Sequence, residues 1–285
     1  MLSATEVRAA QRRRRSPYSD KQHYQEYILQ RVEGYKNSIG RDELLRLGDE
    51  AASELQANSE GQFVLTEVLM LESVDRLIMK RLSLRPYRRW RQQFIKLRAA
   101  QRTPTHWGLE PHCPLAPLLP RLEPEDTALV VGTHAAATTY LLAAHDAAVT
   151  FIAADLGCVE RVESRMAAEA LASLFESYVT QLDHSLPDFL SFLTGVDVIV
   201  LDPSVLVGLG ASARSELVDD LQMRSRPGGI HVLLPTCRAI GPDALRSLYP
   251  GWTQEEDPKR RRRNTDSRRQ EGLILCKPTC PPDTA

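Results

Sequence analysis

The sequence predicts an α/β protein in which a doubly wound, mostly parallel sheet follows an N-terminal helical region. Before residue 103, apolar side chains recur at three- and four-residue spacing, which is typical of amphipathic helices. After residue 126, short apolar runs alternate with helix-like stretches, the order that βαβ units produce. Six prolines fall within residues 103–126, so we expect a linker there.

Helical spacing places four helices in the N-terminal region, which we bound at residues 20–102. The apolar positions repeat within residues 20–37, 42–56, 62–82 and 86–100. Pro86 fits the first turn of the fourth helix, because that position needs no backbone N–H donor. Residues 1–19 contain four consecutive arginines and no apolar core, so we expect a disordered basic tail, and residues 279–285 form a second tail.

The α/β domain, bounded at residues 127–278, is recognised by its apolar runs and the turns between them. Strands are predicted at residues 127–131, 149–154, 179–182, 196–201, 229–234 and 272–276. Helices are predicted between them at residues 135–144, 158–175, 212–224 and 243–249. Strands that alternate with helices of this length pair in parallel within one sheet.

The composition is that of a globular protein with a sizeable core. Of 285 residues, 42% are hydrophobic and 26% are charged, which excludes a wholly disordered, collagen-like or disulfide-stapled chain. Five cysteines without paired spacing indicate reduced thiols and a cytoplasmic location. The longest uncharged run, residues 128–144, is short for a membrane span and contains Gly132, Thr133 and His134, so we expect no membrane segment.

The charge is strongly segregated along the chain although the net charge is only −1. Residues 121–257 carry 8 arginines, no lysine and 20 acidic residues, a net charge of −12. Residues 258–285 carry +5, and the first 120 residues carry +6. Basic ends therefore flank an acidic middle, which excludes a uniform surface that coats nucleic acid.

The candidate ligand site lies at the turn after the first predicted strand. In doubly wound sheets, ligands bind outside the carboxyl ends of the strands, at the point where the strand order reverses. Gly132, Thr133 and His134 occupy that turn, and the helix after it would offer free backbone N–H groups to an anionic group. The alternative is a tight turn that binds nothing.

Several segments between residues 107 and 278 resemble one family of enzymes. The resemblance is carried by residues 107–111, 128–132, 226–229 and 244–252. In these segments the chain resembles class I S-adenosylmethionine-dependent methyltransferases, especially the small-molecule type that includes tellurite-resistance and thiopurine methyltransferases. The resemblance implies a Rossmann-like sheet, S-adenosylmethionine (SAM) as cofactor, and methyl transfer to a small-molecule or unknown acceptor.

The resemblance also implies roles for individual residues. The cofactor loop would contain Gly132, Thr133 and His134. Asp155 would accept hydrogen bonds from the ribose, Asp183 would contact the adenine, and Asp202 would face the substrate. Three of these residues have a simpler alternative. His134 would be a solvent-facing or helix-capping histidine, Asp183 a helix N-cap or loop aspartate, and Asp202 part of an Asp-Pro turn. No catalytic residue is implied, because methyl transfer depends mainly on the alignment of donor and acceptor.

The chain departs from the family in its cofactor site, where it also lacks the further glycines that the family usually has near His134 and Ala136. Val130 stands where the family usually has an acidic residue, and Ala153 stands where the second strand usually ends in the ribose-binding carboxylate. Asp155, two residues later, is then the candidate for that role. An alternative function is therefore a catalytically inactive pseudo-methyltransferase that acts as an interaction module.

A further alternative is a nucleic-acid-binding protein that uses the basic helix 86–102. Nine basic and no acidic residues lie in residues 80–102, and such cations neutralise phosphates. Tyr87, Trp90 and Phe94 recur at helical spacing, so they either stack on bases or form the buried face of the helix. The second arrangement would place the arginines on the solvent-exposed face of the helix.

Histidine and cysteine spacing gives no metal site. His106, His112 and Cys113 lie close together without a second pair of ligands. Cys276 and Cys280 are separated by three residues in a proline-rich tail. We therefore expect no metal centre.

Overall fold

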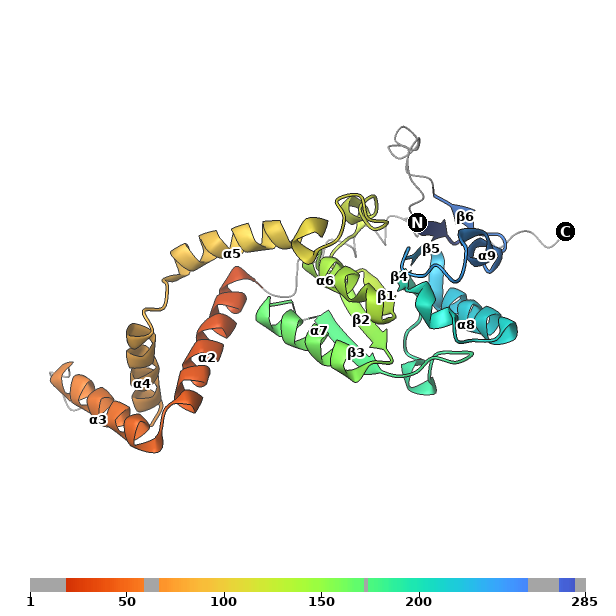
Figure 1. Ribbon diagram of the computed structural model, residues 1–285. Coiled ribbons are helices and arrows are strands. Elements are labelled where there is room, and N and C mark those ends of the chain that lie inside the picture. Colours follow the sequence, from red (N-terminus) through yellow and green to blue (C-terminus); the bar gives the residue numbers. More distant parts are fainter. Residues whose placement is uncertain (1–18, 59–66, 172–173, 256–271, 280–285) are drawn as a thin grey trace, which may run out of the picture. The chain divides into compact units, whose positions relative to one another are not determined.

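The computed structural model describes residues 19–58, 67–171, 174–255 and 272–279 (Figure 1). The chain divides after Leu97 into a helical unit and an α/β unit. All but Ser19 of the expected N-terminal tail, and all but Thr279 of the expected C-terminal tail, lie outside the described residues. Among the described residues, no helix combines the length and apolarity that a membrane span requires.

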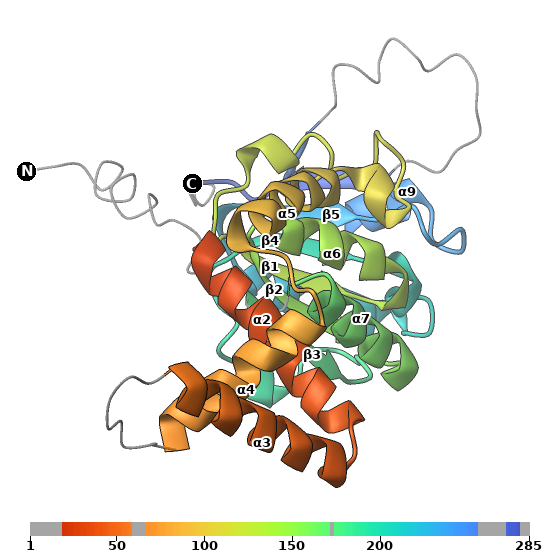
Figure 2. The ribbon, with the colours of Figure 1, turned by 90° about the vertical axis from the view of Figure 1, so that its left-hand side faces the viewer.

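The helical unit is a small bundle around one apolar cluster. Its described residues form α2 (Asp20–Ser38), α3 (Arg41–Asn58), α4 (Glu67–Arg81) and most of α5 (Tyr87–Gln101), the last residues of which belong to the α/β unit. α4 packs against both α2 and α3, as Figure 2 shows. The cluster contains Val32, Leu47, Ala51, Val74, Leu77 and Ile78. The first residues of the predicted helix 62–82 lie outside the described part of the chain.

The described residues of the α/β unit form a seven-stranded sheet in the order β3-β2-β1-β4-β5-β7-β6. Its strands are β1 (Thr127–Val131), β2 (Ala148–Ala153), β3 (Phe175–Val179), β4 (Val196–Leu201), β5 (Ser225–Leu233), β6 (Thr253–Gln254) and β7 (Leu273–Cys276). The first five strands pair in parallel, and β7 runs antiparallel to both β5 and β6. The predicted doubly wound, mostly parallel sheet is confirmed.

Helices cover both faces of this sheet. α6 (Ala136–Ala144) and α7 (Leu156–Ala168) lie on one face, and α8 (Ala211–Arg224) lies on the other, as does α9 (Pro242–Ser247) (Figure 1). Successive strand residues alternate between the two core clusters, because side chains of a strand point to opposite faces. In β1, Val130 belongs to the α6/α7 side and Leu129 to the α8 side. The strand order reverses between β1 and β4, so ligands are expected at their carboxyl ends.

The third strand and the helix before it differ from the sequence-based prediction. The strand is β3 at Phe175–Val179, whereas we expected it at residues 179–182, and α7 ends at Ala168 instead of residue 175. Ala170 has a φ of 55°, a left-handed conformation that stops the helix. β3 is the edge strand of the sheet and is only partly buried, so it lacks the continuous apolar run of β1 or β4.

Residues 103–126, expected as a linker, are part of the α/β core. Trp107, Leu115 and Leu118 are buried in the cluster on the α6/α7 face. The Trp107 indole Nε1 donates to the backbone oxygen of Gln101 at 2.6 Å, and its ring lies 5.1 Å from that of Tyr140. The prolines set the turns of this segment while the apolar residues between them pack, so proline content alone did not indicate a linker.

Candidate functional site

The carboxyl ends of the central strands meet at Asp202, the residue after β4. Its backbone N–H donates to the oxygen of Val131 at the end of β1 at 2.8 Å. The Asp202 side chain has no exposed surface, although the sequence predicted that it would face substrate. Because β1, β4 and β5 are neighbours in the sheet, the loops that follow all three strands are within reach of this carboxylate.

One buried carboxylate hydrogen-bonds all three loops. Oδ1 of Asp202 accepts from the Ser204 backbone N–H at 3.0 Å and from the Thr236 hydroxyl at 2.6 Å. Oδ2 accepts from the backbone N–H of His134 at 3.1 Å and lies 2.8 Å from His134 Nδ1. Burial raises the pKa of Asp202, but the hydrogen bonds from Thr236, Ser204 and His134 outweigh it and hold the pKa below its usual value. Asp202 is therefore a carboxylate at neutral pH.

Gly132 allows the turn after β1 to approach Asp202 this closely. Its backbone has φ 104° and ψ 151°, a region that is essentially restricted to glycine. A Cβ atom at this position would lie 2.5 Å from Cβ of Asp202 and 2.9 Å from Cγ2 of Val205. The glycine that the sequence assigned to a cofactor loop is thus also required for the contact between two loops.

His134 presents its imidazole ring at the surface beside this contact. Its side chain is 62% exposed, whereas the Asp202 side chain that it contacts is fully buried. Nδ1 also lies 3.3 Å from the Ser204 hydroxyl. When the Nδ1–H donates to Asp202, Nε2 of the neutral ring is an acceptor. Among the described residues, no hydrogen bond engages Nε2, so this nitrogen is available to a ligand.

The other two predicted aspartates differ in their relation to this contact. Asp155 caps the N-terminus of α7, where Oδ1 accepts from the Gly157 N–H at 3.0 Å, and its side chain is 54% exposed. The first turn of α7 reaches the cofactor loop, since Cys158 Sγ lies 3.8 Å from the Thr133 oxygen. Asp183, four residues beyond β3, is 77% exposed, and within the described chain its side chain pairs with His184 at 3.3 Å. The structure thus joins Asp183 to none of the other site residues.

Two residues of the contact were not singled out by the sequence reasoning. Thr236 follows β5 by three residues, and Ser204 follows the Asp-Pro pair at the end of β4. Both lie just beyond the carboxyl ends of parallel strands. Polar residues at every such strand end, including that of β5, are the signal that could have identified them.

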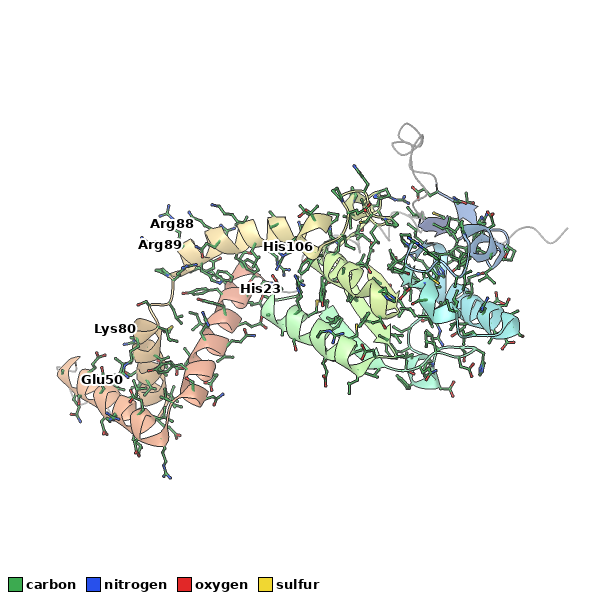
Figure 3. All side chains as sticks on the ribbon, in the orientation of Figure 1. His23, Glu50, Lys80, Arg88, Arg89 and His106 are labelled. Carbon is green, nitrogen blue, oxygen red and sulfur yellow. The ribbon has the colours of Figure 1, made fainter. Side chains whose placement is uncertain are left out.

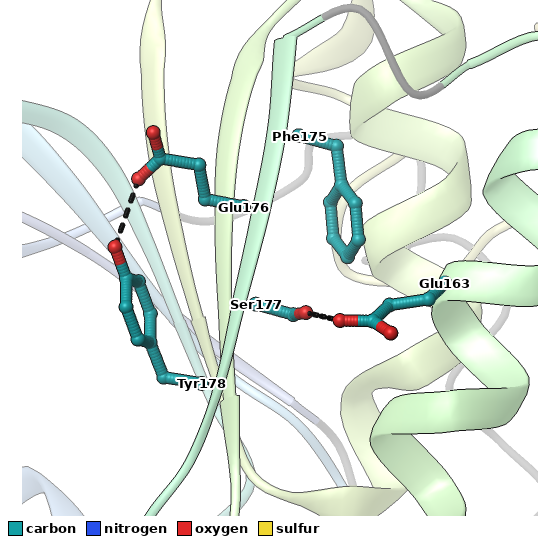
Figure 4. Close-up of a pocket in the computed structure, with 5 residues that line it drawn as sticks. All are labelled: Glu163, Phe175, Glu176, Ser177 and Tyr178. Carbon is teal, nitrogen blue, oxygen red and sulfur yellow. Dashed lines mark hydrogen bonds between the residues drawn. The ribbon is translucent and has the colours of Figure 1, made fainter.

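A surface hollow of about 370 Å³ lies elsewhere, along the outer edge of β3 (Figure 4). It is lined by Glu163, Phe175, Glu176, Ser177 and Tyr178. Its polar groups bind one another, because Ser177 donates to Glu163 and the Tyr178 hydroxyl donates to Glu176 at 3.1 Å. We therefore place the candidate site at the carboxyl ends of the strands and not in this hollow.

Metal-binding groups are absent from the described part of the chain, where no three histidine, cysteine or acidic side chains converge. Among the described residues, Cys113, Cys158, Cys237 and Cys276 form no disulfide.

Comparison with known proteins finds similarity among solved structures. No protein-family model matches the chain, and no curated protein matches its sequence. The N-methyltransferase NodS of Bradyrhizobium japonicum is 18% identical, with 54% of this chain and 86% of NodS covered and a TM-score of 0.41. A TehB-like SAM-dependent methyltransferase of Corynebacterium glutamicum is 15% identical, with 67% and 97% covered and a TM-score of 0.43. TehB of Haemophilus influenzae is 13% identical, with 57% and 61% covered and a TM-score of 0.41.

Proposed function

We propose that the α/β unit is a SAM-dependent methyltransferase in which Asp202 positions His134 as a general base. The observation that carries the proposal is the Nδ1–Oδ2 contact of 2.8 Å between an exposed imidazole and a fully buried carboxylate. The pair lies where the strand order of the sheet reverses, which is the usual ligand position in this class of fold. The acceptor is a small molecule of unknown identity.

The residues at the strand ends fit the polar groups of SAM. The cofactor has ribose hydroxyls, and Asp155 offers a half-exposed carboxylate two residues after the end of β2. SAM also carries a carboxylate, and the N-terminus of α6, which follows the cofactor loop, has the partial positive charge that favours an anionic group. Asp155 and the start of α6 would therefore hold SAM, and when bound SAM supplies a methyl group that is already activated for transfer.

His134 would take up the proton that the acceptor loses. A hydroxyl, thiol or ammonium group becomes a better nucleophile when a base removes its proton, and imidazole suits that task near neutral pH. Asp202 would fix the ring orientation, keep the proton of the neutral ring on Nδ1 and stabilise the imidazolium that forms. A positioned general base contributes about 10²- to 10⁴-fold to a rate.

Calorimetry with SAM and with its demethylated product tests the binding half of this proposal. Asp155→Ala is expected to weaken binding about 10- to 150-fold, because a hydrogen bond to a charged group is worth about 1.5–3 kcal/mol. Glu160→Ala, which removes an exposed carboxylate from the same helix, is the matched control and should bind as the wild type does. Absence of heat at millimolar ligand would overturn the proposal.

The second candidate function is the inactive pseudo-methyltransferase that serves as an interaction module. It is favoured by the close packing of Asp202 and Val205 on Gly132, which draws the cofactor loop onto the β4 loop. Ala153 at the end of β2 favours it as well, since the buried alanine cannot bind ribose. The same calorimetry separates the two candidates, because an inactive module that lost the cofactor gives no binding heat.

A further inference from the structure

α5 has two faces of opposite character. Trp90, only 9% exposed, stacks on Phe94 with a ring-centroid distance of 4.6 Å and lies 5.2 Å from Tyr24 of α2. Tyr87 joins the same group, 5.4 Å from Tyr24. These aromatic rings lie in the contact between α2 and α5, with Trp90 buried and Tyr87 and Phe94 half-buried, which favours the buried face of the helix over base stacking.

The opposite face of α5 carries a basic stripe, which we define as Arg88, Arg89, Gln92 and Lys96. Residues spaced by three and four positions share one face of a helix, and these four fall about half a turn away from Trp90 and Phe94. All four side chains are exposed. Figure 3 shows Arg88 and Arg89 extending from the start of the helix.

The cations of the stripe are not neutralised within the described part of the chain. Some other basic side chains of the helical unit pair with carboxylates, such as Arg91 with Asp20 at 2.6 Å and Lys36 with Asp75 at 2.8 Å. No ion pair engages the charged residues of the stripe in the described residues. The first turn of α5 has no acidic residue either, so two arginines stand where the helix dipole disfavours cations. The three cations of the stripe are therefore exposed and available to an external anion.

We propose that the basic stripe binds the phosphate backbone of a nucleic-acid duplex. Arginine forks match phosphate geometry, and two of the three cations are arginines. From Arg88 to Lys96 the helix rises about 12 Å, which spans roughly three to four phosphates of one strand. Trp90 is buried and Tyr87 and Phe94 are half-buried, which disfavours a single strand bound by base stacking.

The amide of Gln92 adds a neutral donor among the three cations, and such groups also contact phosphates and sugars. The expected binding is insensitive to base sequence, because phosphate contacts carry no sequence information directly. This proposal concerns the helical unit alone and is independent of methyl transfer.

Fluorescence anisotropy of the full chain with a labelled 20-base-pair DNA duplex tests the proposal. The stripe variant is Arg88→Gln/Arg89→Gln/Lys96→Gln. The control, Arg31→Gln/Arg41→Gln/Arg76→Gln, removes the same charge from exposed positions of the same unit that form no ion pair in the described chain. Circular dichroism should show unchanged helix content and melting in both variants.

We expect the stripe to contribute about three phosphate contacts, hence about 2.7 to the slope of log affinity against log salt. A slope contribution of this size lowers the affinity about 40-fold between 50 and 200 mM salt. The stripe variant should lack this part of the salt dependence, and the control variant should keep it. Equal losses in both variants would mean that net charge alone binds DNA and would overturn the proposal. So would tighter binding to anionic vesicles or to a polyglutamate chain than to the duplex.

Discussion

Replacing Gly132 with alanine tests whether the cofactor loop is packed directly onto Asp202. The backbone at Gly132, with φ 104° and ψ 151°, costs a non-glycine residue about 1–3 kcal/mol. The new Cβ would lie 2.5 Å from Cβ of Asp202 and 2.9 Å from Cγ2 of Val205, and overpacking of this kind costs about 1–3 kcal/mol more. We therefore expect Gly132→Ala to lower the free energy of unfolding of the α/β unit by about 2–6 kcal/mol.

Gly251 provides the matched control for this prediction. It has a φ of 76°, and a Cβ atom there would meet nothing within 4 Å. Gly251→Ala should therefore cost only the backbone strain, about 1–2 kcal/mol. The excess loss in Gly132→Ala over Gly251→Ala measures the loop contact.

Urea unfolding followed by tryptophan fluorescence is the assay. A Trp90→Phe background removes the tryptophan of the helical unit and leaves Trp107 and Trp252, both buried in the α/β unit. A Val205→Ala substitution added to Gly132→Ala should recover part of the loss, because it removes one of the two contacts. Equal losses for Gly132→Ala and Gly251→Ala, with no recovery, would refute the reasoning.

Three other perturbations have defined outcomes. Asp202→Asn places an amide N–H₂ against the groups that donate to the carboxylate, so it should lower the free energy of unfolding by about 1.5–3 kcal/mol at pH 7. Because the pKa of Asp202 is lowered in the folded state, the stabilisation by its carboxylate is lost as the pH falls through that pKa. Urea unfolding curves of the variant and the wild type should therefore converge in acid. His231, buried in β5, has a pKa lowered to about 3 by burial and by Lys277, so the unfolded chain binds an extra proton below about pH 6.5. The wild type should lose about 2 kcal/mol between pH 7 and pH 5 that His231→Gln does not lose. Trp107→Ala should cost about 3–5 kcal/mol in urea and Trp107→Phe much less, whereas a linker residue would tolerate both changes.

The central strands could be predicted from sequence because both faces of the sheet are covered. β1 and β4 are buried almost throughout and read as uninterrupted apolar runs, and both were predicted at the bounds that the structure has. β3, at the sheet edge, has two polar residues, Glu176 and Ser177, in its middle and pairs with β2 alone among the described strands, so it lacks an uninterrupted apolar run. Burial on both faces of the sheet is therefore what made a strand predictable from its sequence.

The position of the candidate site could be predicted from sequence, but the hydrogen bonds between its residues could not. The rule that ligands bind at the carboxyl ends of strands placed Gly132, His134 and Asp202 at one edge of the sheet. The contact itself joins His134 to Asp202, 68 positions apart, and Asp202 to Thr236, a further 34 positions on. Periodicity and local motifs report on neighbours in the chain, so a hydrogen-bond network of this separation needs coordinates.

Asp202 both holds together the loops at the strand ends and, in the proposed function, positions His134. A substitution of Asp202 therefore changes stability and the proposed catalysis together. His134 can separate them, because its backbone N–H makes one bond to Asp202 whatever the side chain is, and its ring is 62% exposed. We expect His134→Gln to keep the unfolding free energy within about 1 kcal/mol of the wild type, since a largely exposed side chain contributes little. SAM affinity measured by calorimetry should also be unchanged, because the base acts on the acceptor and not on the cofactor. A loss of stability as large as that of Asp202→Asn would instead make the imidazole part of the structural contact, and Asp202 would then be a loop anchor without a base to position.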